Sequence, residues 1–87
     1  MAKIEIYSTA MCPYCVAAKN LFAARGLDFH ELRIDVNPAV CREMLQRAPG
    51  VRTVPQIFIN GTHVGGFDDL AAAERSGELD RLLADPA

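Results

Sequence analysis

Apolar and polar residues alternate at the start of the chain and then take on a helical spacing. The alternation over residues 1–7 predicts a β-strand, and residues 8–10 follow as a turn. A helix is predicted from Pro13, because proline suits the first helical position, where its missing N–H costs nothing. Arg25 and Gly26 end it, with a cation in the last turn and a glycine that can adopt a left-handed cap. The apolar stripe of this helix consists of Cys15, Ala18, Leu21 and Phe22.

A second strand is predicted around Phe29, Leu32 and Ile34, the apolar residues that follow the helix. Its alternation is broken over residues 30–32, so we expect either an edge strand or a β-bulge there. On such a strand His30 is expected to be a solvated side chain rather than an acid–base group.

Asn37 and Pro38 predict the start of a second helix, the first as its side-chain cap and the second as its opening residue. Pro49-Gly50 ends this helix. Cys41 borders its apolar face, where a cysteine usually behaves as a small apolar residue, and we prefer this interpretation to a regulatory thiol. The face itself comprises Val40, Met44, Leu45 and Ala48.

Residues 57–59 form a short apolar run that predicts a third strand. Asn60-Gly61, directly after it, is the strongest hairpin signal in the sequence, and residues 62–64 return as the fourth strand. His63 lies in this return strand, where exposure is expected, and it is assigned no role.

Residues 65–67 turn the chain into a last helical segment that begins at Asp68-Asp69. Gly77 interrupts this segment, and a final turn or two ends at Asp85-Pro86. The predicted order is therefore β-α-β-α-β-β-α. The first three elements can form a right-handed parallel crossover, and the hairpin adds two antiparallel strands. The sequence predicts an α/β fold, with a four-stranded mixed sheet and helices on both faces.

Eighty-seven residues, 51% of them hydrophobic, suffice for one small domain with its own core, expected to span residues 1–87. The formal net charge is −2, and no basic or aromatic-interleaved run points to nucleic acid. No apolar stretch has the length of a signal peptide or of a membrane span. We therefore expect a cytoplasmic monomer. In that reducing compartment a cysteine pair is more often catalytic or metal-binding than structural.

Cys12 and Cys15 form a C-x-x-C pair at the start of the first predicted helix. Residues three positions apart lie about one helical turn apart, so their sulfurs can bond and hold two electrons reversibly. The other interpretation is half of a zinc site, which needs two further ligands at a characteristic spacing. Cys41, His30 and His63 lack that spacing, so a redox role is preferred and no metal is expected.

The two sulfurs are expected to be unequal. The apolar stripe turns Cys15 inward and leaves Cys12 at the open end of the helix, so one sulfur is exposed and the other shielded. A nucleophilic cysteine must be a thiolate, which the N-terminus of a helix favours. We expect further stabilisation from hydrogen bonds to the Cys12 sulfur, donated by the backbone N–H groups of Tyr14 and Cys15 and by the Cys15 thiol.

Three motifs together resemble those of the glutaredoxins, and more narrowly of the small bacterial dithiol glutaredoxins. They are C-P-Y-C after the first strand, T-V-P before the third and G-G-F-D-D after the fourth. The likeness runs from Ile4 to about Leu83, with the motifs in family order and at family separations. It implies the minimal thioredoxin fold. It also implies that Cys12 is the nucleophile and Cys15 its resolving partner, with Tyr14 shaping the substrate surface.

The resemblance further implies a glutathione site and a cis Val54-Pro55 bond, although only about 5–6% of X-Pro bonds in folded proteins are cis. Val54, extended because it precedes proline, can pair its backbone with the glutathione peptide like an added strand. The amides of Phe67 and Asp68 suit the α-carboxylate of glutathione and the Asp68 side chain its ammonium, while simple helix capping is the plainer interpretation of Asp68-Asp69. The implied glutathione contacts are Tyr14, Thr53, Val54, Pro55, Gly66, Phe67 and Asp68.

By this resemblance the chain is a glutathione-dependent oxidoreductase that reduces protein–glutathione mixed disulfides and protein disulfides without a bound cofactor. Glutathione is the co-substrate, recycled by NADPH and glutathione reductase, and ribonucleotide reductase is a family-level target. Two alternatives stay open: an electron donor recharged by thioredoxin reductase, and an iron–sulfur carrier in which two chains share a cluster. Pro13 should hinder cluster access. Thr9 stands where many relatives carry lysine, which removes a positive charge near the thiolate.

Overall fold

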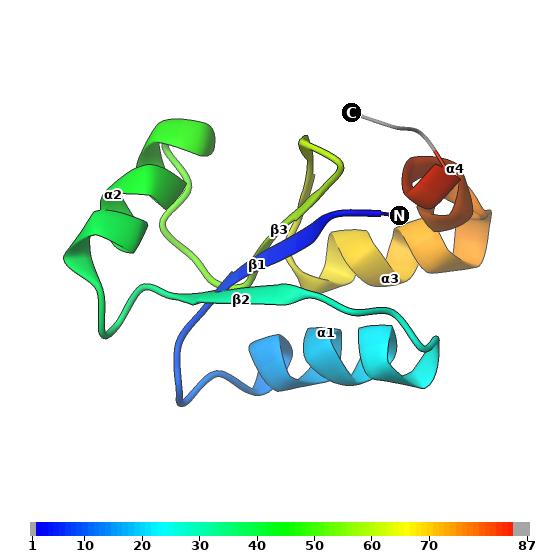
Figure 1. The fold of residues 1–87 in the computed structure, drawn as a ribbon, viewed down its shortest axis with the longest axis horizontal. Helices are drawn as coiled ribbons and strands as arrows, with labels where there is room; N and C mark the ends of the chain where they lie inside the picture. Colours follow the sequence, from blue (N-terminus) through cyan, green and yellow to red (C-terminus); the bar gives the residue numbers. More distant parts are fainter. Residues whose placement is uncertain (1, 85–87) are drawn as a thin grey trace.

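The computed structural model describes residues 2–84, and this part of the chain holds a four-stranded sheet and four helices (Figure 1). No helix among these residues is long and apolar enough to cross a membrane. The last helical segment divides at Gly77, as predicted, whereas its predicted end at Asp85-Pro86 lies outside the described residues. The elements are β1 (Ile4–Ser8), α1 (Pro13–Ala24), β2 (His30–Arg33), α2 (Pro38–Arg47), β3 (Gln56–Ile59), β4 (Thr62–Gly65), α3 (Phe67–Ser76) and α4 (Glu78–Ala84).

The strands form one mixed sheet in the order β2-β1-β3-β4. β1 pairs with β2 in parallel and with β3 antiparallel, and β3 and β4 form the predicted antiparallel hairpin. Asn60 and Gly61 turn that hairpin with φ values of 50° and 84°, a left-handed conformation that these two residue types adopt readily. The predicted four-stranded mixed sheet is therefore confirmed.

Helices cover both faces of the sheet, also as predicted (Figure 1). α2 lies on one face, where Met44 and Ala48 pack with Tyr7 and Phe58. α1, α3 and α4 lie on the other face. The core there consists of Ile4, Ile6, Ala18, Phe22, Ile57, Ile59, Leu70, Ala73, Leu79 and Leu82.

β2 is an edge strand, as predicted, but the alternative of a bulge within it is wrong. Its pairing with β1 runs in register along its whole length. Leu32 packs beneath α2, and the next residue back, Glu31, points to the other face, where it contacts Lys19 of α1. The apparent break in alternation thus comes from a polar residue on an inward face. The shift in register lies in the hairpin instead, between Ile57 and Phe58.

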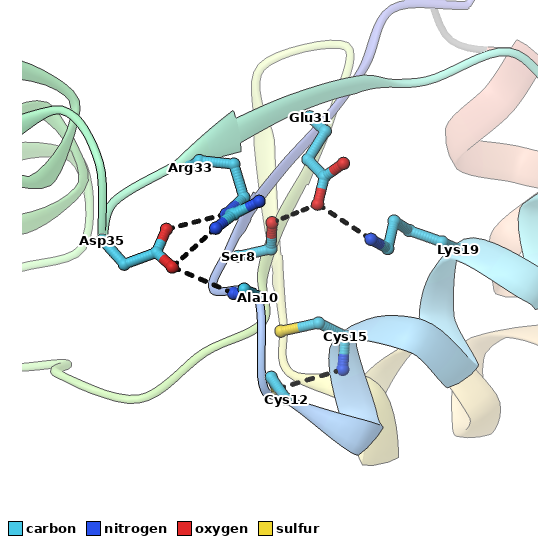
Figure 2. A network of polar contacts seen from close by, with 8 residues as sticks. All are labelled: Ser8, Ala10, Cys12, Cys15, Lys19, Glu31, Arg33 and Asp35. Atoms are coloured by element: carbon cyan, nitrogen blue, oxygen red, sulfur yellow. Dashed lines mark hydrogen bonds and ion pairs between the residues drawn. The ribbon is translucent and has the colours of Figure 1, made fainter.

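Ser8 ends β1, although the sequence pattern predicted that it opens the following turn. Its side chain is fully buried, and a buried hydroxyl needs a hydrogen-bond partner. It donates to a carboxylate oxygen of Glu31 over 2.6 Å. This bond joins the end of β1 to β2 beside the start of α1, where the C-x-x-C pair lies (Figure 2).

Candidate active site

Cys12 is the N-cap of α1 and Cys15 lies in its first turn, as predicted. Pro13 takes the first helical position, while Cys12 keeps an extended backbone with φ −124° and ψ 104°. The Cys12 sulfur accepts a hydrogen bond from the backbone N–H of Cys15 over 3.1 Å. Both cysteines are free thiols. The helix start therefore aims a backbone donor at the first sulfur.

The expectation that Cys12 is exposed is wrong. Its side chain is 8% exposed, and that of Cys15 is fully buried. A loop far along the chain covers Cys12: its thiol lies 3.6 Å from the backbone carbonyl of Val54 and donates to it. Of the predicted donors to the Cys12 sulfur, the Cys15 N–H and thiol are present, whereas the Tyr14 N–H makes no such bond within residues 2–84.

The sulfurs remain unequal, because Cys15 is held as a neutral thiol. Burial raises the pKa of Cys15 to about 12, and its hydrogen bond with Cys12 adds to the rise. The backbone N–H of Thr9 and the charge of Lys19 act in the opposite direction with smaller effect. At neutral pH Cys15 therefore keeps its proton until something in the reaction removes it.

The raised pKa of Cys15 predicts a loss of stability in alkali. In the unfolded chain the thiol ionises near pH 8.5, whereas in the folded chain it keeps its proton up to about pH 12, so rising pH stabilises only the unfolded state in between. We expect the free energy of unfolding of the reduced protein to fall by about 1–2 kcal/mol more in the wild type than in Cys15→Ala between pH 8 and 10. Urea titrations at both pH values measure this, and an unchanged difference between the two proteins would contradict it.

A groove of about 470 Å³ opens beside the cysteines, and it gathers every residue of the implied glutathione site. Tyr14 forms one rim: it is 62% exposed, and its ring centroid lies 6.4 Å from that of Phe67 across the groove. The Val54-Pro55 bond is cis, as the resemblance implied. The lining residues from the prediction are Tyr14, Thr53, Val54, Pro55, Gly66, Phe67 and Asp68.

Helix capping, the plainer interpretation of Asp68-Asp69, is performed by Asp69. Its carboxylate accepts a hydrogen bond from the backbone N–H of Gly66 over 3.1 Å and so fixes the start of α3. An added Cβ at Gly65, where φ is 117°, would lie 2.3 Å from the same carboxylate. Only glycine fits there without displacing the cap. Asp68 is exposed at the lip of the groove.

Five of the residues that line the groove were not predicted from the sequence. His63, which was assigned no role, is exposed as expected, yet its ring stacks on Phe58 at 4.7 Å and shares a 2.7 Å hydrogen bond with Gln56. Gln56 in turn donates to the backbone carbonyl of Thr53 over 3.0 Å. The hairpin register could have suggested the Phe58–His63 pair, because the two residues face each other across it. The missed lining residues are Val51, Gln56, His63, Gly65 and Asp69.

A polar network lies behind Cys15, and it too went unpredicted (Figure 2). One carboxylate oxygen of Glu31 accepts hydrogen bonds from the hydroxyl of Ser8 and, over 2.8 Å, from the ammonium of Lys19. The sequence indicates only that Lys19, four residues after Cys15, shares its side of the helix, and it does not indicate Glu31 as the partner of Lys19. A second group of polar contacts lies next to this network. There the carboxylate of Asp35 accepts hydrogen bonds from the guanidinium of Arg33 and from the backbone N–H of Ala10.

The third cysteine, Cys41, belongs to α2 rather than to α1. Its side chain is half-buried, which is compatible with the predicted place at the border of the apolar face. Within residues 2–84 no group of three or more histidine, cysteine, aspartate or glutamate side chains is arranged to hold a metal ion.

Comparisons with known proteins agree on one family. The glutaredoxin family model matches residues 4–64. A glutaredoxin of Pseudomonas aeruginosa is 51% identical over 84 residues, covering 97% of this chain and 99% of that protein. Glutaredoxin 3 of Escherichia coli is 52% identical over 83 residues, covering 95% and 99%.

Solved structures agree as well. The solution structure of a Brucella melitensis glutaredoxin matches with a TM-score of 0.80 and 47% identity over 95% of this chain and 89% of that one. The crystal structure of a buckwheat glutaredoxin–glutathione complex matches with a TM-score of 0.82 and 34% identity over 92% of this chain and 74% of that one. The minimal thioredoxin fold implied by the resemblance is thereby confirmed.

Proposed function

The chain belongs to the glutaredoxin family, which uses glutathione as co-substrate, and we propose that it is a glutathione-dependent thiol-disulfide oxidoreductase acting through Cys12 and Cys15. The proposal is carried by the position of the groove next to the Cys12 thiol. The groove is lined by Val54, whose carbonyl lies 3.6 Å from the Cys12 sulfur. A tripeptide thiol bound in the groove would therefore present its sulfur close to Cys12.

The groove offers complementary groups to the peptide, the α-carboxylate and the ammonium of glutathione. Val54 precedes a proline and can pair its backbone with the peptide of the ligand. The first amides of α3, those of Phe67 and Asp68, have no partner inside the helix and suit an α-carboxylate. The carboxylate of Asp68 suits the ammonium group. The buckwheat glutaredoxin, solved as a glutathione complex, supports glutathione as the ligand.

The simpler reaction uses Cys12 alone. Its thiolate attacks the glutathione sulfur of a protein–glutathione mixed disulfide, so the bond between the protein and glutathione breaks and one between Cys12 and glutathione forms. The released protein thiolate takes a proton from water. A second glutathione thiolate then attacks the glutathionyl sulfur, and oxidised glutathione leaves while Cys12 is restored. Outside the protein, NADPH and glutathione reductase return oxidised glutathione to two thiols.

The second reaction also uses Cys15 and acts on protein disulfides. Cys12 forms a mixed disulfide with one sulfur of the target, and Cys15 then attacks Cys12 to close the internal disulfide and free the target. Two glutathiones reopen that bond. We propose that this happens in the cytoplasm, on disulfide-bearing or glutathionylated proteins of which ribonucleotide reductase is one candidate, and with residues 1–87 acting as a single monomeric domain.

The test is NADPH oxidation coupled to reduction of a glutathione mixed disulfide. With glutathione and glutathione reductase we expect turnover that depends on the concentration of glutathione. In Asp68→Asn we expect the KM for glutathione to rise about three- to tenfold, because a hydrogen-bonded contact at an exposed site contributes about 0.7–1.4 kcal/mol. Asp28→Asn, the same change at an exposed position before β2, is the matched control and should leave KM unaltered.

Thioredoxin reductase in place of glutathione and its reductase separates the proposal from its rival. If the wild type is inactive with glutathione but turns over with thioredoxin reductase, the glutathione groove is wrongly assigned and the chain is a thioredoxin-like electron donor. If it turns over with glutathione but Asp68→Asn behaves as Asp28→Asn does, the function stands and the placement of the ligand ammonium is wrong.

A further inference from the structure

Lys19 and Glu31 form an ion pair immediately behind the C-x-x-C pair (Figure 2). Their side chains are only 26% and 30% exposed, and the 2.8 Å contact is a direct hydrogen bond. The buried hydroxyl of Ser8 holds the same carboxylate oxygen over 2.6 Å. Lys19 and Ser8 together hold the pKa of Glu31 below its usual range, so at neutral pH both charges are present.

The position of Lys19 on α1 relates this ion pair to Cys15. Lys19 follows Cys15 by four residues on α1, which places both on the same side of the helix. Figure 2 shows the Cys15 sulfur directed from α1 toward Ser8, at the end of β1, and Ala10, in the turn that follows. The sulfur is fully buried there, in surroundings where a nearby charge is poorly screened.

We propose that the Lys19–Glu31 pair, anchored to the sheet by Ser8, sets the reactivity of the resolving thiol Cys15 and thereby the balance between the glutathione route and the internal-disulfide route. The inference rests on the proposed function and deepens it, because it assigns positioning residues to one of its two routes. Lys19 and Glu31 do not touch the reacting sulfurs. They act on Cys15 through its electrostatic surroundings.

The step in question is closure of the internal disulfide. Cys15 loses its proton to solvent, and its thiolate attacks the Cys12 sulfur of the mixed disulfide. The bond between Cys12 and its partner sulfur breaks, the bond between Cys12 and Cys15 forms, and the partner leaves as a thiolate that takes up a proton. Closure therefore depends on the fraction of Cys15 that is ionised, whereas the exchange between Cys12 and glutathione does not.

The two charges act on this step with opposite sign. The ammonium of Lys19 favours a Cys15 thiolate, and the carboxylate of Glu31 offsets that effect by neutralising the ammonium. The other charged groups at this corner, Arg33 and Asp35, are paired with each other over 2.6 Å. Removing Lys19 therefore leaves a bare negative charge near Cys15, and removing the charge of Glu31 leaves a bare positive one.

The experiment mixes reduced protein with oxidised glutathione and stops the reaction with acid at intervals. Mass spectrometry then separates the Cys12–glutathione adduct from the closed disulfide. At pH 7 we expect Lys19→Met to slow closure about three- to tenfold, Glu31→Gln to speed it by a similar factor, and the double variant to return within about twofold of the wild type. The pH at which closure becomes fast should rise in Lys19→Met and fall in Glu31→Gln.

Lys3→Met and Glu74→Gln are the matched controls, because they make the same changes of charge at exposed positions away from the cysteines. They should close at the wild-type rate. If both network variants slow closure equally at every pH, or neither changes it, the pair is merely structural and the inference is overturned. If the wild type forms no adduct with glutathione at all, the proposed function has failed, and the adduct signal tells these two outcomes apart.

Discussion

Replacing Cys12 by serine is expected to abolish both reactions. Every bond change in either route passes through the Cys12 sulfur, and a serine hydroxyl without a general base is a far weaker nucleophile at neutral pH. We expect the coupled turnover of glutathione mixed disulfides to fall at least about a thousandfold, to the level of glutathione alone. Steady-state NADPH oxidation with glutathione and glutathione reductase measures it directly.

This variant should lose the chemistry and keep the fold. Cys12 is the N-cap of α1, and its sulfur accepts the Cys15 N–H over 3.1 Å. Serine is among the best N-cap residues, so its hydroxyl can take over that hydrogen bond and preserve the helix start. The free energy of unfolding should therefore stay within about 1 kcal/mol of the wild type. Retained activity in a folded Cys12→Ser protein would mean that another thiol, Cys15 or Cys41, is the nucleophile.

The local signals in the sequence were enough to predict the scaffold. Pro13 and Asn37 marked helix starts, Asn60-Gly61 marked the hairpin, and Gly77 marked the break between α3 and α4. Each of these signals acts within a few residues of the chain, where backbone preferences decide the outcome. The residues that line the groove were also predicted in part, but this prediction depended on the resemblance of three motifs to those of a known family.

The errors about Cys12 and Glu31 lie where distant segments meet. Cys12 was expected to be exposed because a helix start is open, yet Val54, which is 42 residues away, closes over it. Glu31 looked like a break in a strand because a polar residue usually faces water. It faces inward here because Lys19 from α1 and Ser8 from β1 supply its partners. Such pairings depend on tertiary contact and leave no periodic signal in a single sequence.

Cys15→Ser is expected to separate the two proposed routes. Reduction of a protein disulfide in a single turnover without glutathione should fall to background, because the remaining described thiol, Cys41, belongs to α2 on the opposite face of the sheet from α1. Turnover of glutathione mixed disulfides should stay within about threefold of the wild type, since that route returns Cys12 through a second glutathione. The hydrogen bond to the Cys12 sulfur comes from the backbone N–H of residue 15, which serine retains.

The decisive readout for Cys15→Ser is the fate of the target protein. Without a resolving thiol, Cys12 should remain covalently joined to its target, so a non-reducing gel should show a mixed-disulfide complex that the wild type does not accumulate. Adding glutathione should release that complex, because a glutathione thiolate can do from solvent what Cys15 does from within α1. If the variant instead frees the target as fast as the wild type, Cys15 is not the resolving thiol. The burial that raises the pKa of Cys15 to about 12 would then serve packing rather than chemistry.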